Sequence, residues 1–554
     1  MRSDDGDAPS CFDAGSANEF GLTRRRFAAF ALRWGVPVGL FTPEQGLASP
    51  QPPARSTAWL SPRDFGASME GVGDDADALQ KTLDAADRTG KVVMIDGRLK
   101  IGRTLSLIGR GGFDIDWMAS LVSYIGPPGS PLLDMTGAGT IRQRGGTFTG
   151  NGTNDFVKTA GSRRAQEAVL PAPLPGEEHW SRQLWFENMV VTGFDTGFDL
   201  QNWSREIWVT NCHLTGNLQG ISARGKVVNL RVSGTTLYSA LALSRAYRCR
   251  GDTIDAGRRF GEGHFFQGVI ADVQGIAYDV RDLYCWRVAG GQIKSARGGA
   301  AIAYTAGVTS LTRDAFVSDA LLQGAIDIGG GLARQTLMQF KGSNLVFSDV
   351  ADTAFIVRSN TKGVTLEGAS FDTPIGTARM FSIGANCAGI KLEGLQPDAV
   401  SYTNAPLIDP TSVAGLEADF TGTWTPRLAL DGSSEGIVHR LQAGRFRWSG
   451  GTLSGDWQLV ITSIGRASGA MAITGLPYAA QHPDASATME KMTGLTLAKP
   501  IALDIREGTS TIAFKDVRLA NRTTSETPRT DQPLANANVT GDLVMSGRFS
   551  FDLR

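Results

Sequence analysis

Two segments of the sequence, LWFENMVVTG at Leu184–Gly193 and IWVTNCHLTG at Ile207–Gly216, can be overlaid residue by residue. A weaker third copy, Leu230–Leu237, follows after the same interval of 23 residues. Each copy alternates apolar or β-branched residues with polar ones and places Asn or Gly at a bend. A repeat of this length is typical of a solenoid, and the fixed Leu/Asn consensus of leucine-rich repeats is missing. The repeat therefore predicts a parallel β-helix.

Weaker copies continue toward the C-terminus in Ser343–Asp349, Val364–Phe371 and Ile390–Leu395. In a parallel β-helix, strands of successive coils pair at about 4.8 Å, and inward side chains stack on the same position of the next coil. At about 23 residues per coil, the repeating segment is expected to make about 15 coils.

Two pairs of matching positions carry specific expectations. Asn188 and Asn211 are expected to stack at a turn, where they would bond to each other and to nearby backbone. Trp185 and Trp208 are expected to stack inside the core.

The length and composition of the chain limit the classes of protein to which it can belong. The 554 residues exceed the roughly 250–300 that one hydrophobic core supports, so a solenoid with a further module is expected. The 68 glycines favour many tight turns. With 54 basic and 55 acidic residues, the chain lacks the positive charge that drives binding to nucleic acid. The five cysteines show no CxxC pair, which favours neither a zinc ribbon nor a disulfide scaffold.

The N-terminus reads as an export signal. Thr23–Phe27 (TRRRF) resembles the twin-arginine signature, and the moderately apolar Ala28–Leu40 that follows is too short to span a bilayer. We expect residues 1–48 to be removed and the mature protein, without a membrane span, to be periplasmic, at the cell surface or extracellular.

A single helix is expected near the start of the mature chain. Asp74 and Asp75 can cap its N-terminus, and Gly90 ends it. The strand Val92–Ile95 follows directly. This helix would cover the open end of the first coil, which otherwise exposes apolar surface and unpaired backbone.

The same region carries a resemblance. Arg63–Ala67 (RDFGA) and Gly71–Leu79 (GVGDDADAL) are similar to the opening motif of the pectate-lyase-like right-handed parallel β-helix superfamily, which occurs in rhamnogalacturonase-like proteins and phage tailspikes. The resemblance implies this fold and polysaccharide substrates, and it assigns no catalytic role to the opening residues.

The C-terminal region follows a different pattern. Its successive motifs are similar to a β-sandwich module of phage tail fibres and tailspikes, which implies binding or assembly, often in trimers. These motifs are Gly422–Pro426, Gln442–Phe446, Ala467–Ala470, Ile473–Tyr478 and Met545–Phe549.

The expected architecture is all-β: a right-handed parallel β-helix with an N-terminal capping helix, then a C-terminal β-sandwich or jelly-roll module. The expected divisions are a twin-arginine signal peptide (1–48), a linker (49–62), the β-helix (63–410) and the C-terminal module (416–554).

Chemistry is expected on an outer groove near Arg248–Trp286, where the regular spacing breaks and charged residues alternate with aromatic ones. The candidate catalytic residues are Asp252, Asp255, Arg258, Arg259, Glu262, His264, Asp272 and Tyr278.

Two mechanisms use these residues differently. In a lyase, Arg258 or Arg259 would neutralise a uronate carboxylate, and His264 or Tyr278 would move the protons. A hydrolase needs two carboxyl groups, about 5 Å apart for retention or about 6.5–9.5 Å for inversion. Its pair would come from Asp252, Asp255, Glu262 and Asp272.

The candidate sugar-binding residues are Trp180, Trp203, His213 and Phe260. Trp180 and Trp203 offer flat faces to sugar rings. His213 is expected to point outward, because it alternates with inward Cys212 and Leu214.

The sequence thus favours an exported enzyme that cleaves an acidic, uronate-containing polysaccharide, with lyase chemistry preferred. The alternatives are a glycoside hydrolase, a uronate epimerase, and a non-catalytic glycan-binding or surface-assembly protein, possible as a homotrimer. No cofactor is assigned, and a calcium ion is left open.

Overall fold

The computed structural model describes residues 59–553 with internal gaps. The gaps are 162–179, 251–260, 297–298, 307–312, 330–334, 373–378, 398–406, 466–468, 479, 481–484, 496–500, 506–507, 517–532 and 535–538. The predicted export signal and Cys11 lie outside the described residues.

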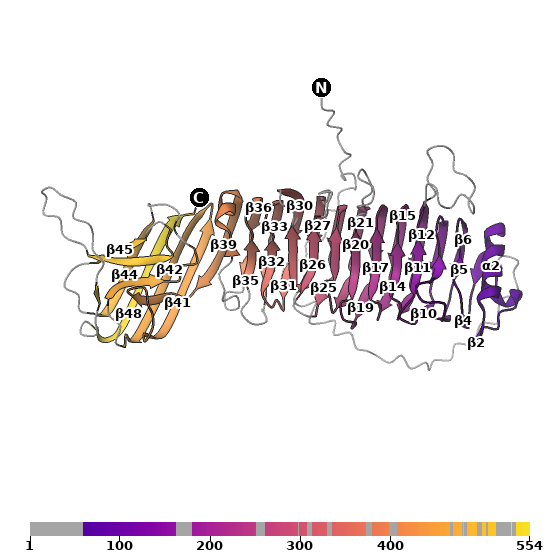
Figure 1. Cartoon of the computed structure of the whole chain (residues 1–554), viewed down its shortest axis with the longest axis horizontal. Helices are drawn as coiled ribbons and strands as arrows, with labels where there is room; N and C mark the ends of the chain where they lie inside the picture. Colours follow the sequence, from indigo (N-terminus) through magenta and orange to yellow (C-terminus); the bar gives the residue numbers. More distant parts are fainter. Residues whose placement is uncertain are drawn as a thin grey trace, which may run out of the picture. The chain divides into compact units, whose positions relative to one another are not determined.

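Three parallel β-sheets run along the coils, and each coil contributes one strand to each sheet (Figure 1). Sheet A contains β1 (Trp59–Leu60), β3 (Val92–Met94), β6 (Gly111–Asp116), β9 (Gly139–Arg144), β12 (Ser181–Glu187), β15 (Ser204–Thr210), β18 (Val227–Ser233), β21 (Gly261–Gln267), β24 (Leu283–Ala289), β27 (Arg313–Ser318), β30 (Thr336–Ser343), β33 (Thr361–Glu367) and β36 (Ala388–Glu393).

Sheet B contains β2 (Glu70–Asp74), β4 (Arg98–Ile101), β7 (Leu121–Tyr124), β10 (Thr147–Thr149), β13 (Val190–Thr192), β16 (His213–Thr215), β19 (Thr236–Ser239), β22 (Ile270–Val273), β25 (Gln292–Ser295), β28 (Leu321–Gln323), β31 (Val346–Ser348), β34 (Ser370–Phe371) and β37 (Gln396–Pro397).

Sheet C contains β5 (Leu105–Ser106), β8 (Pro131–Asp134), β11 (Asp155–Thr159), β14 (Thr196–Leu200), β17 (Gln219–Arg224), β20 (Arg245–Arg250), β23 (Tyr278–Arg281), β26 (Ala300–Thr305), β29 (Ala325–Gly329), β32 (Thr353–Val357), β35 (Arg379–Ile383) and β38 (Leu407–Ile408).

The predicted parallel β-helix is confirmed, but the predicted number of coils is too high. Sheet C has 12 strands and sheet B has 13 in the described part of the chain, where about 15 coils were expected. The reason is that several coils are longer than the repeat. Leu184 pairs with Ile141 of the preceding coil, and His264 pairs with Leu230, so both intervals exceed 23 residues.

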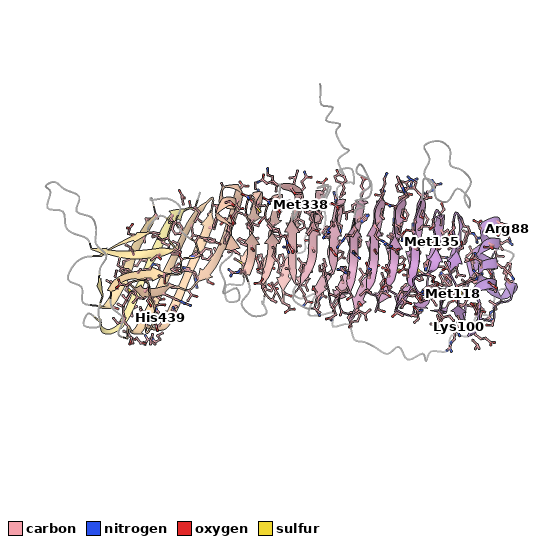
Figure 2. All side chains as sticks on the ribbon, viewed as in Figure 1. Arg88, Lys100, Met118, Met135, Met338 and His439 are labelled. Atoms are coloured by element: carbon pink, nitrogen blue, oxygen red, sulfur yellow. The ribbon has the colours of Figure 1, made fainter. Side chains whose placement is uncertain are left out.

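The core lies inside the coils. On sheet A, Leu184, Ile207 and Leu230 are in register and fully buried, so each apolar side chain stacks on its counterpart in the next coil. Met135 and Met338 are likewise fully buried (Figure 2). Burial of these repeated positions is the main source of stability for the fold.

The turns between sheets A and B repeat one backbone conformation. Asn188, Asn211 and Gly234 have φ values of 55°, 51° and 57°, in the left-handed region that Asn and Gly adopt most easily. The N–H of Asn188 donates to the carbonyl of Thr210 in the next coil, 3.0 Å away. The two asparagines therefore occupy equivalent turn positions, as predicted.

Helix α2 (Ala76–Thr89) forms where the sequence predicts it and ends at Gly90, whose φ is 66°. Its apolar face, which includes Leu79 and Leu83, is buried. The capping differs in part from the prediction. Asp74 accepts a hydrogen bond from the N–H of Ala76, whereas the carboxylate of Asp75 turns away and accepts from the N–H of Ser68.

Two short 3-10 helices flank the coils: η1 (Pro62–Phe65) precedes the first complete coil, and η2 (Pro410–Gly415) follows the last. Helix η1 is closed by Ser61 and Asp64, which bond reciprocally to each other's backbone.

The C-terminal region forms two antiparallel sheets. The first contains β39 (Leu416–Trp424), β41 (Val438–Ser449), β42 (Thr452–Ser463), β48 (Val539–Asp552) and β44 (Ser486–Leu495). The second contains β40 (Arg427–Leu430), β43 (Gly469–Thr474), β46 (Thr511–Asp516), β45 (Ile501–Ile505) and β47 (Pro533–Leu534).

Glycines alternate with aromatic residues across the first antiparallel sheet. Gly444 lies between Trp424 and Trp457 on the neighbouring strands. A Cβ at Gly444 would come within 2.3 Å of the indole of Trp424, so the ring covers a position that only glycine permits. The strand order joins this sheet to the coils through β36 and β39, and the β-sandwich predicted for this region stays a prediction.

Within the described ranges, no helix has the length and apolar character needed to cross a bilayer. None of the cysteines that the structure describes forms a disulfide.

Candidate functional site

One outward row of side chains on sheet A combines aromatic rings with cations. The residues occupy the same register position in successive coils, from β12 to β30. They are Trp185, Trp208, Arg231, Phe265, Arg287, Phe316 and Lys341. Because neighbouring coils are about 4.8 Å apart, the row presents a ring or a cation at nearly constant intervals.

Trp185 and Trp208 are stacked, with ring centroids 4.7 Å apart and an angle of 6° between the planes. The stacking was predicted, but its place in the core was wrong. Leu184 and Phe186, on either side of Trp185, are fully buried, so the alternation of a strand turns the indole outward. The two rings remain half-buried because each covers one face of the other.

The row continues with positive charge. The guanidinium of Arg231 lies over the ring of Phe265, 5.8 Å from its centroid. Among the residues that the structure describes, neither Arg231 nor Arg287 forms an ion pair with a carboxylate. At the start of the row, by contrast, Arg142 pairs with Glu187 at 2.8 Å.

A second aromatic cluster lies where the chain passes from sheet C into sheet A. The rings of Trp180 and Trp203 meet edge to face, with centroids 5.1 Å apart. The ammonium of Lys226 lies 4.8 Å from the centroid of Trp203 and 5.2 Å from that of Trp180. The guanidinium of Arg205 lies 5.3 Å from the Trp180 ring, and its buried Nε has no hydrogen-bond partner in the described residues.

We call these two groups together the sheet A face: the outward row from Trp185 to Lys341 and the cluster Trp180, Trp203, Arg205 and Lys226. The two groups share the coils of β12, β15 and β18, and the row continues to β30. The face offers flat apolar surfaces for sugar rings and cations for acidic groups. Lys341 at its end pairs with Glu367 at 3.0 Å, whereas Arg231 and Arg287 have no carboxylate partner among the described residues. Of the predicted sugar-binding residues, Trp180 and Trp203 belong to it, but Trp203 is only 7% exposed, so Trp180 is the accessible ring of the pair.

His213 points outward as expected, exposed between the buried Cys212 and Leu214. It lies on sheet B, in register with Val190 and Thr236, and so outside the sheet A face. Phe260 lies outside the described residues.

Four of the predicted catalytic residues, Asp252, Asp255, Arg258 and Arg259, also lie outside the described residues. The remaining two carboxylates are not brought together. Glu262 is exposed on sheet A, whereas Asp272 is on sheet B, where it pairs with Lys294 at 3.4 Å.

His264 and Tyr278 require a correction, because both are fully enclosed in the core and cannot reach a polymer on the outer surface. Nδ1 of His264 bonds to the hydroxyl of Tyr247, and Nε2 lies 2.8 Å from the carbonyl oxygen of Val227. Burial lowers the pKa of His264 to about 4 and raises the pKa of Tyr278. We assign neither a part in the chemistry.

The structure draws attention to carboxylates on sheet C that the sequence analysis missed. Burial, and then the charge of Asp199, raises the pKa of Asp155 to about 6. Asp199 is nearly buried and is held by Arg224, whose Nη2 donates to Oδ2 at 2.6 Å and to Oδ1 at 2.8 Å. Only the register of β11 and β14 brings these residues near each other, and no local motif marks it.

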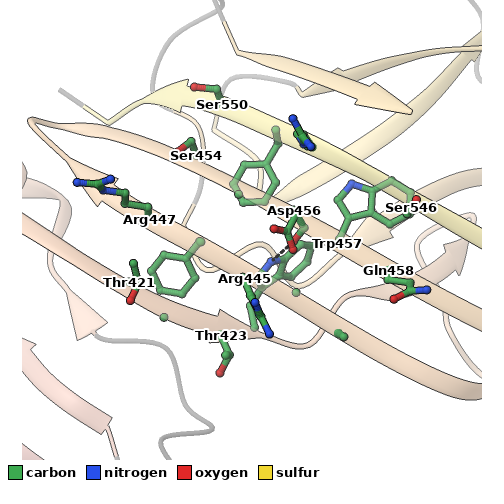
Figure 3. Close-up of a pocket in the computed structure, with 18 of the residues that line it drawn as sticks. Thr421, Thr423, Arg445, Arg447, Ser454, Asp456, Trp457, Gln458, Ser546 and Ser550 are labelled. Atoms are coloured by element: carbon green, nitrogen blue, oxygen red, sulfur yellow. Dashed lines mark hydrogen bonds between the residues drawn. The ribbon is translucent and has the colours of Figure 1, made fainter. Parts of the chain in front are cut away.

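A separate groove of about 1500 Å³ opens on the first C-terminal antiparallel sheet (Figure 3). Arg445, Arg447, Asp456 and Gln458 line it from adjacent strands. The indole N–H of Trp424 donates to the carbonyl of Asp456 beneath it, at 3.3 Å. The groove belongs to the region that the sequence associates with binding or assembly.

In the described part of the chain, no group of three or more His, Cys, Asp or Glu side chains is arranged to hold a metal ion.

No protein-family model matches the sequence, and no curated protein matches it. Solved structures similar to it include the Dettilon tailspike protein (gp208), at 12% identity and a TM-score of 0.44 over 89% of this chain and 94% of that chain. The parallel β-helix of this chain is established by its own strand pairing. This is the fold that the resemblance in the opening motif implies.

Two further solved structures are similar to part of the chain. PfbA, a surface adhesin of Streptococcus pneumoniae, has 12% identity and a TM-score of 0.44 over 61% of this chain and 91% of its own. The A-module of the Azotobacter vinelandii mannuronan C-5 epimerase AlgE4 has 13% identity and a TM-score of 0.41 over 63% of this chain and 97% of its own.

Proposed function

We propose that this protein binds an acidic polysaccharide along the sheet A face and cleaves it. The observation that carries the proposal is the stacked pair Trp185–Trp208, continued along the coils by Arg231 and Arg287 without carboxylate partners among the described residues.

The arrangement suits a long, charged glycan. Tryptophan rings stack against the apolar faces of sugar rings. A guanidinium group binds a carboxylate through two parallel hydrogen bonds. Because the row follows the stacking direction of the coils, one extended chain can contact several coils. Many weak contacts then add to a useful affinity.

For the cleavage step, the described residues favour hydrolysis over the elimination that the sequence favoured. The two candidate proton carriers of a lyase, His264 and Tyr278, are enclosed in the core. Burial, and then the charge of Asp199, raises the pKa of Asp155 to about 6, so Asp155 can donate a proton at and below about that pH. A hydrolase needs a second carboxyl group besides its general acid, and Asp199 is on the neighbouring strand β14.

Asp155 lies on sheet C and pairs with Thr196 at the start of β14, whereas Trp203 follows the end of that strand. Asp155 is on β11, which pairs with β14, and β14 leads through Trp203 into β15. A glycan held by the Trp180–Trp203 cluster would therefore lie on coils that also carry Asp155.

The binding part is tested with polygalacturonate and alginate as acidic polymers and dextran as a neutral one. We expect the wild-type protein to bind the acidic polymers more tightly, and Trp208→Ala to weaken that binding. Tyr238→Ala is the matched control, because Tyr238 is an exposed aromatic residue on sheet B. Equal binding of all three polymers, or equal losses in both variants, contradicts the proposal.

The cleavage part is tested by measuring the absorbance of unsaturated uronates together with new reducing ends. New ends without absorbance mean hydrolysis, and both signals mean a lyase. With Asp155 as the acid, cleavage falls as the pH rises above about 6, and Asp155→Asn loses at least about 100-fold. Asp349→Asn, at an exposed turn, should leave the rate unchanged.

Binding without cleavage would leave a glycan-binding or surface-assembly protein, or a uronate epimerase. Exchange of the uronate C5 proton with heavy water distinguishes an epimerase from a non-catalytic protein, because only the epimerase removes that proton.

Four further points are part of the proposal. We propose that α2 covers the first coil, that residues 63–410 and 416–554 act as separate domains, that the second is a β-sandwich with a binding or trimer-forming role, and that the protein is exported by the twin-arginine route. The buried apolar face of α2 and the two antiparallel sheets support the first three.

A further inference from the structure

The outer face of sheet C carries an excess of positive charge over three successive coils. Strands β17, β20 and β23 read QGISAR, RAYRCR and YDVR, and so contain five arginines and one carboxylate. Arg224, Arg250 and Arg281 occupy the same register position in these coils, so their guanidinium groups leave the sheet side by side.

Two carboxylates on these described strands, Asp279 and Asp199, are already engaged by arginines. Oδ2 of Asp279 accepts a hydrogen bond from Nε of Arg245 at 3.0 Å and another from Arg250. Asp199, on the preceding strand β14, accepts hydrogen bonds from Arg224 at both of its carboxylate oxygens.

Arg248, at the centre of this group, is not bound by either of these two carboxylates. It lies between Ser222 and Asp279 in the register, and its Nε is buried with no hydrogen-bond partner in the part of the chain that the structure describes. Burial, and then the charges of Arg250 and Arg245, lowers the pKa of its guanidinium. A buried donor without an acceptor costs free energy that a bound anion would recover.

We propose that Arg248, with Arg250 and Arg281 beside it, binds an oxyanion substituent of an acidic glycan on the outer face of sheet C. The inference rests on the proposed function in one respect: it takes the ligand to belong to the same acidic polysaccharide.

The site accounts for the otherwise unfavourable arrangement. Three arginines in one six-residue strand repel each other, and Asp279 offsets only part of that charge. A carboxylate or a sulfate ester fits the planar fork of a guanidinium with two parallel hydrogen bonds. Ser222, nearly buried next to Arg248 in the register, supplies a hydroxyl donor at the edge.

The site lies on a different sheet from the aromatic row, so the two can be tested independently. The probes are trigalacturonate, which carries carboxylates, and inorganic sulfate, with neutral galactotriose as the blank. Binding is measured by calorimetry on the full chain, for the wild-type protein, Arg248→Gln and Arg98→Gln. Arg98 is an exposed arginine on β4 of sheet B and serves as the charge-matched control.

We expect at least one of the two anions to bind the wild-type protein and Arg98→Gln alike, and to bind Arg248→Gln about tenfold more weakly. Binding of trigalacturonate alone assigns the site to uronates. Binding of sulfate alone assigns it to sulfated sugars. Equal binding of both anions by Arg248→Gln and the wild-type protein, or no binding of either, overturns the inference.

Thermal unfolding distinguishes a lost site from a damaged fold. Removing Arg248 relieves repulsion from Arg245 and Arg250, so the melting temperature of Arg248→Gln without ligand should not fall below that of the wild-type protein. The anion that binds should raise the melting temperature of the wild-type protein only.

Failure of this inference and failure of the proposed function give different results. If Trp208→Ala retains full affinity for polygalacturonate while Arg248→Gln loses the small anion, the sheet A face is wrong and the sheet C site stands. The opposite pattern removes the sheet C site alone.

Discussion

Aromatic residues line both the inside and the outside of the coils, and the two sets differ in burial. Inside, Tyr278, Trp286 and Tyr304 are fully buried and touch one another in succession. Outside, Trp185 and Trp208 stack in the same way but remain half-exposed. Residue type therefore does not separate buried aromatic residues from accessible ones in this fold, whereas on sheet A the alternation along the strand does.

The inner set should carry the larger effect on stability. Trp286→Ala leaves a cavity between Tyr278 and Tyr304 and is expected to lower the free energy of unfolding by about 3–5 kcal/mol. Denaturant unfolding of the two proteins measures the difference. Trp208→Ala is the matched outer variant, and its expected loss is only about 1 kcal/mol. Equal losses would erase the distinction between the inner and outer sets.

The inner set also predicts a dependence on pH. His264 has a pKa of about 4 in the folded protein, and an unfolded histidine titrates near 6.5. Between these values the unfolded state binds more protons, so the free energy of unfolding falls as the pH drops from about 6.5 to about 4. The expected loss is about 3 kcal/mol.

His264→Gln removes the titrating group and should flatten the stability profile over that range, whatever its effect at neutral pH. Denaturant unfolding at several pH values gives the profile. An unchanged slope in the variant means that His264 is not the buried neutral group described here.

The outer set predicts a loss of binding with little loss of stability. Trp208→Ala removes one ring of the stacked pair and should weaken binding of polygalacturonate by about tenfold, since a stacked aromatic contact contributes on the order of 1 kcal/mol. Calorimetry at fixed ionic strength measures the affinity. Full affinity in the variant would mean that Trp208 has only the structural role that the sequence predicted for it.

The smallest expected effect concerns the cations of the outer row. Arg231→Gln should weaken binding only a few-fold in dilute buffer, and the difference from the wild-type protein should shrink in about 0.5 M salt. A loss that persists at high salt would point to packing against Phe265 as the main role of Arg231.

The repeat was sufficient to predict the coils, because strand alternation and turn residues are local signals. Two features were not local. The number of coils depended on insertions, such as the one before Ser181, that lengthen individual coils. The sheet C arginines became a group only through the register of β17, β20 and β23.

The candidate site depends even more on features that are not local in the sequence. Alternation placed His213 outward correctly, and the same rule applied to Trp185 would have turned it outward as well. His264 and Tyr278 were chosen for their chemistry alone, and their inward positions could be recognised only from the pairing of β21 and β23 with their neighbours.

The central claim is that an acidic glycan lies against the outer side of sheet A. The most direct measurement is the structure of the protein with a bound oligogalacturonate. We predict sugar rings on the indoles of Trp185 and Trp208 and a carboxylate at Arg231. An oligosaccharide bound only at the C-terminal groove, with those indoles bare, would contradict the account.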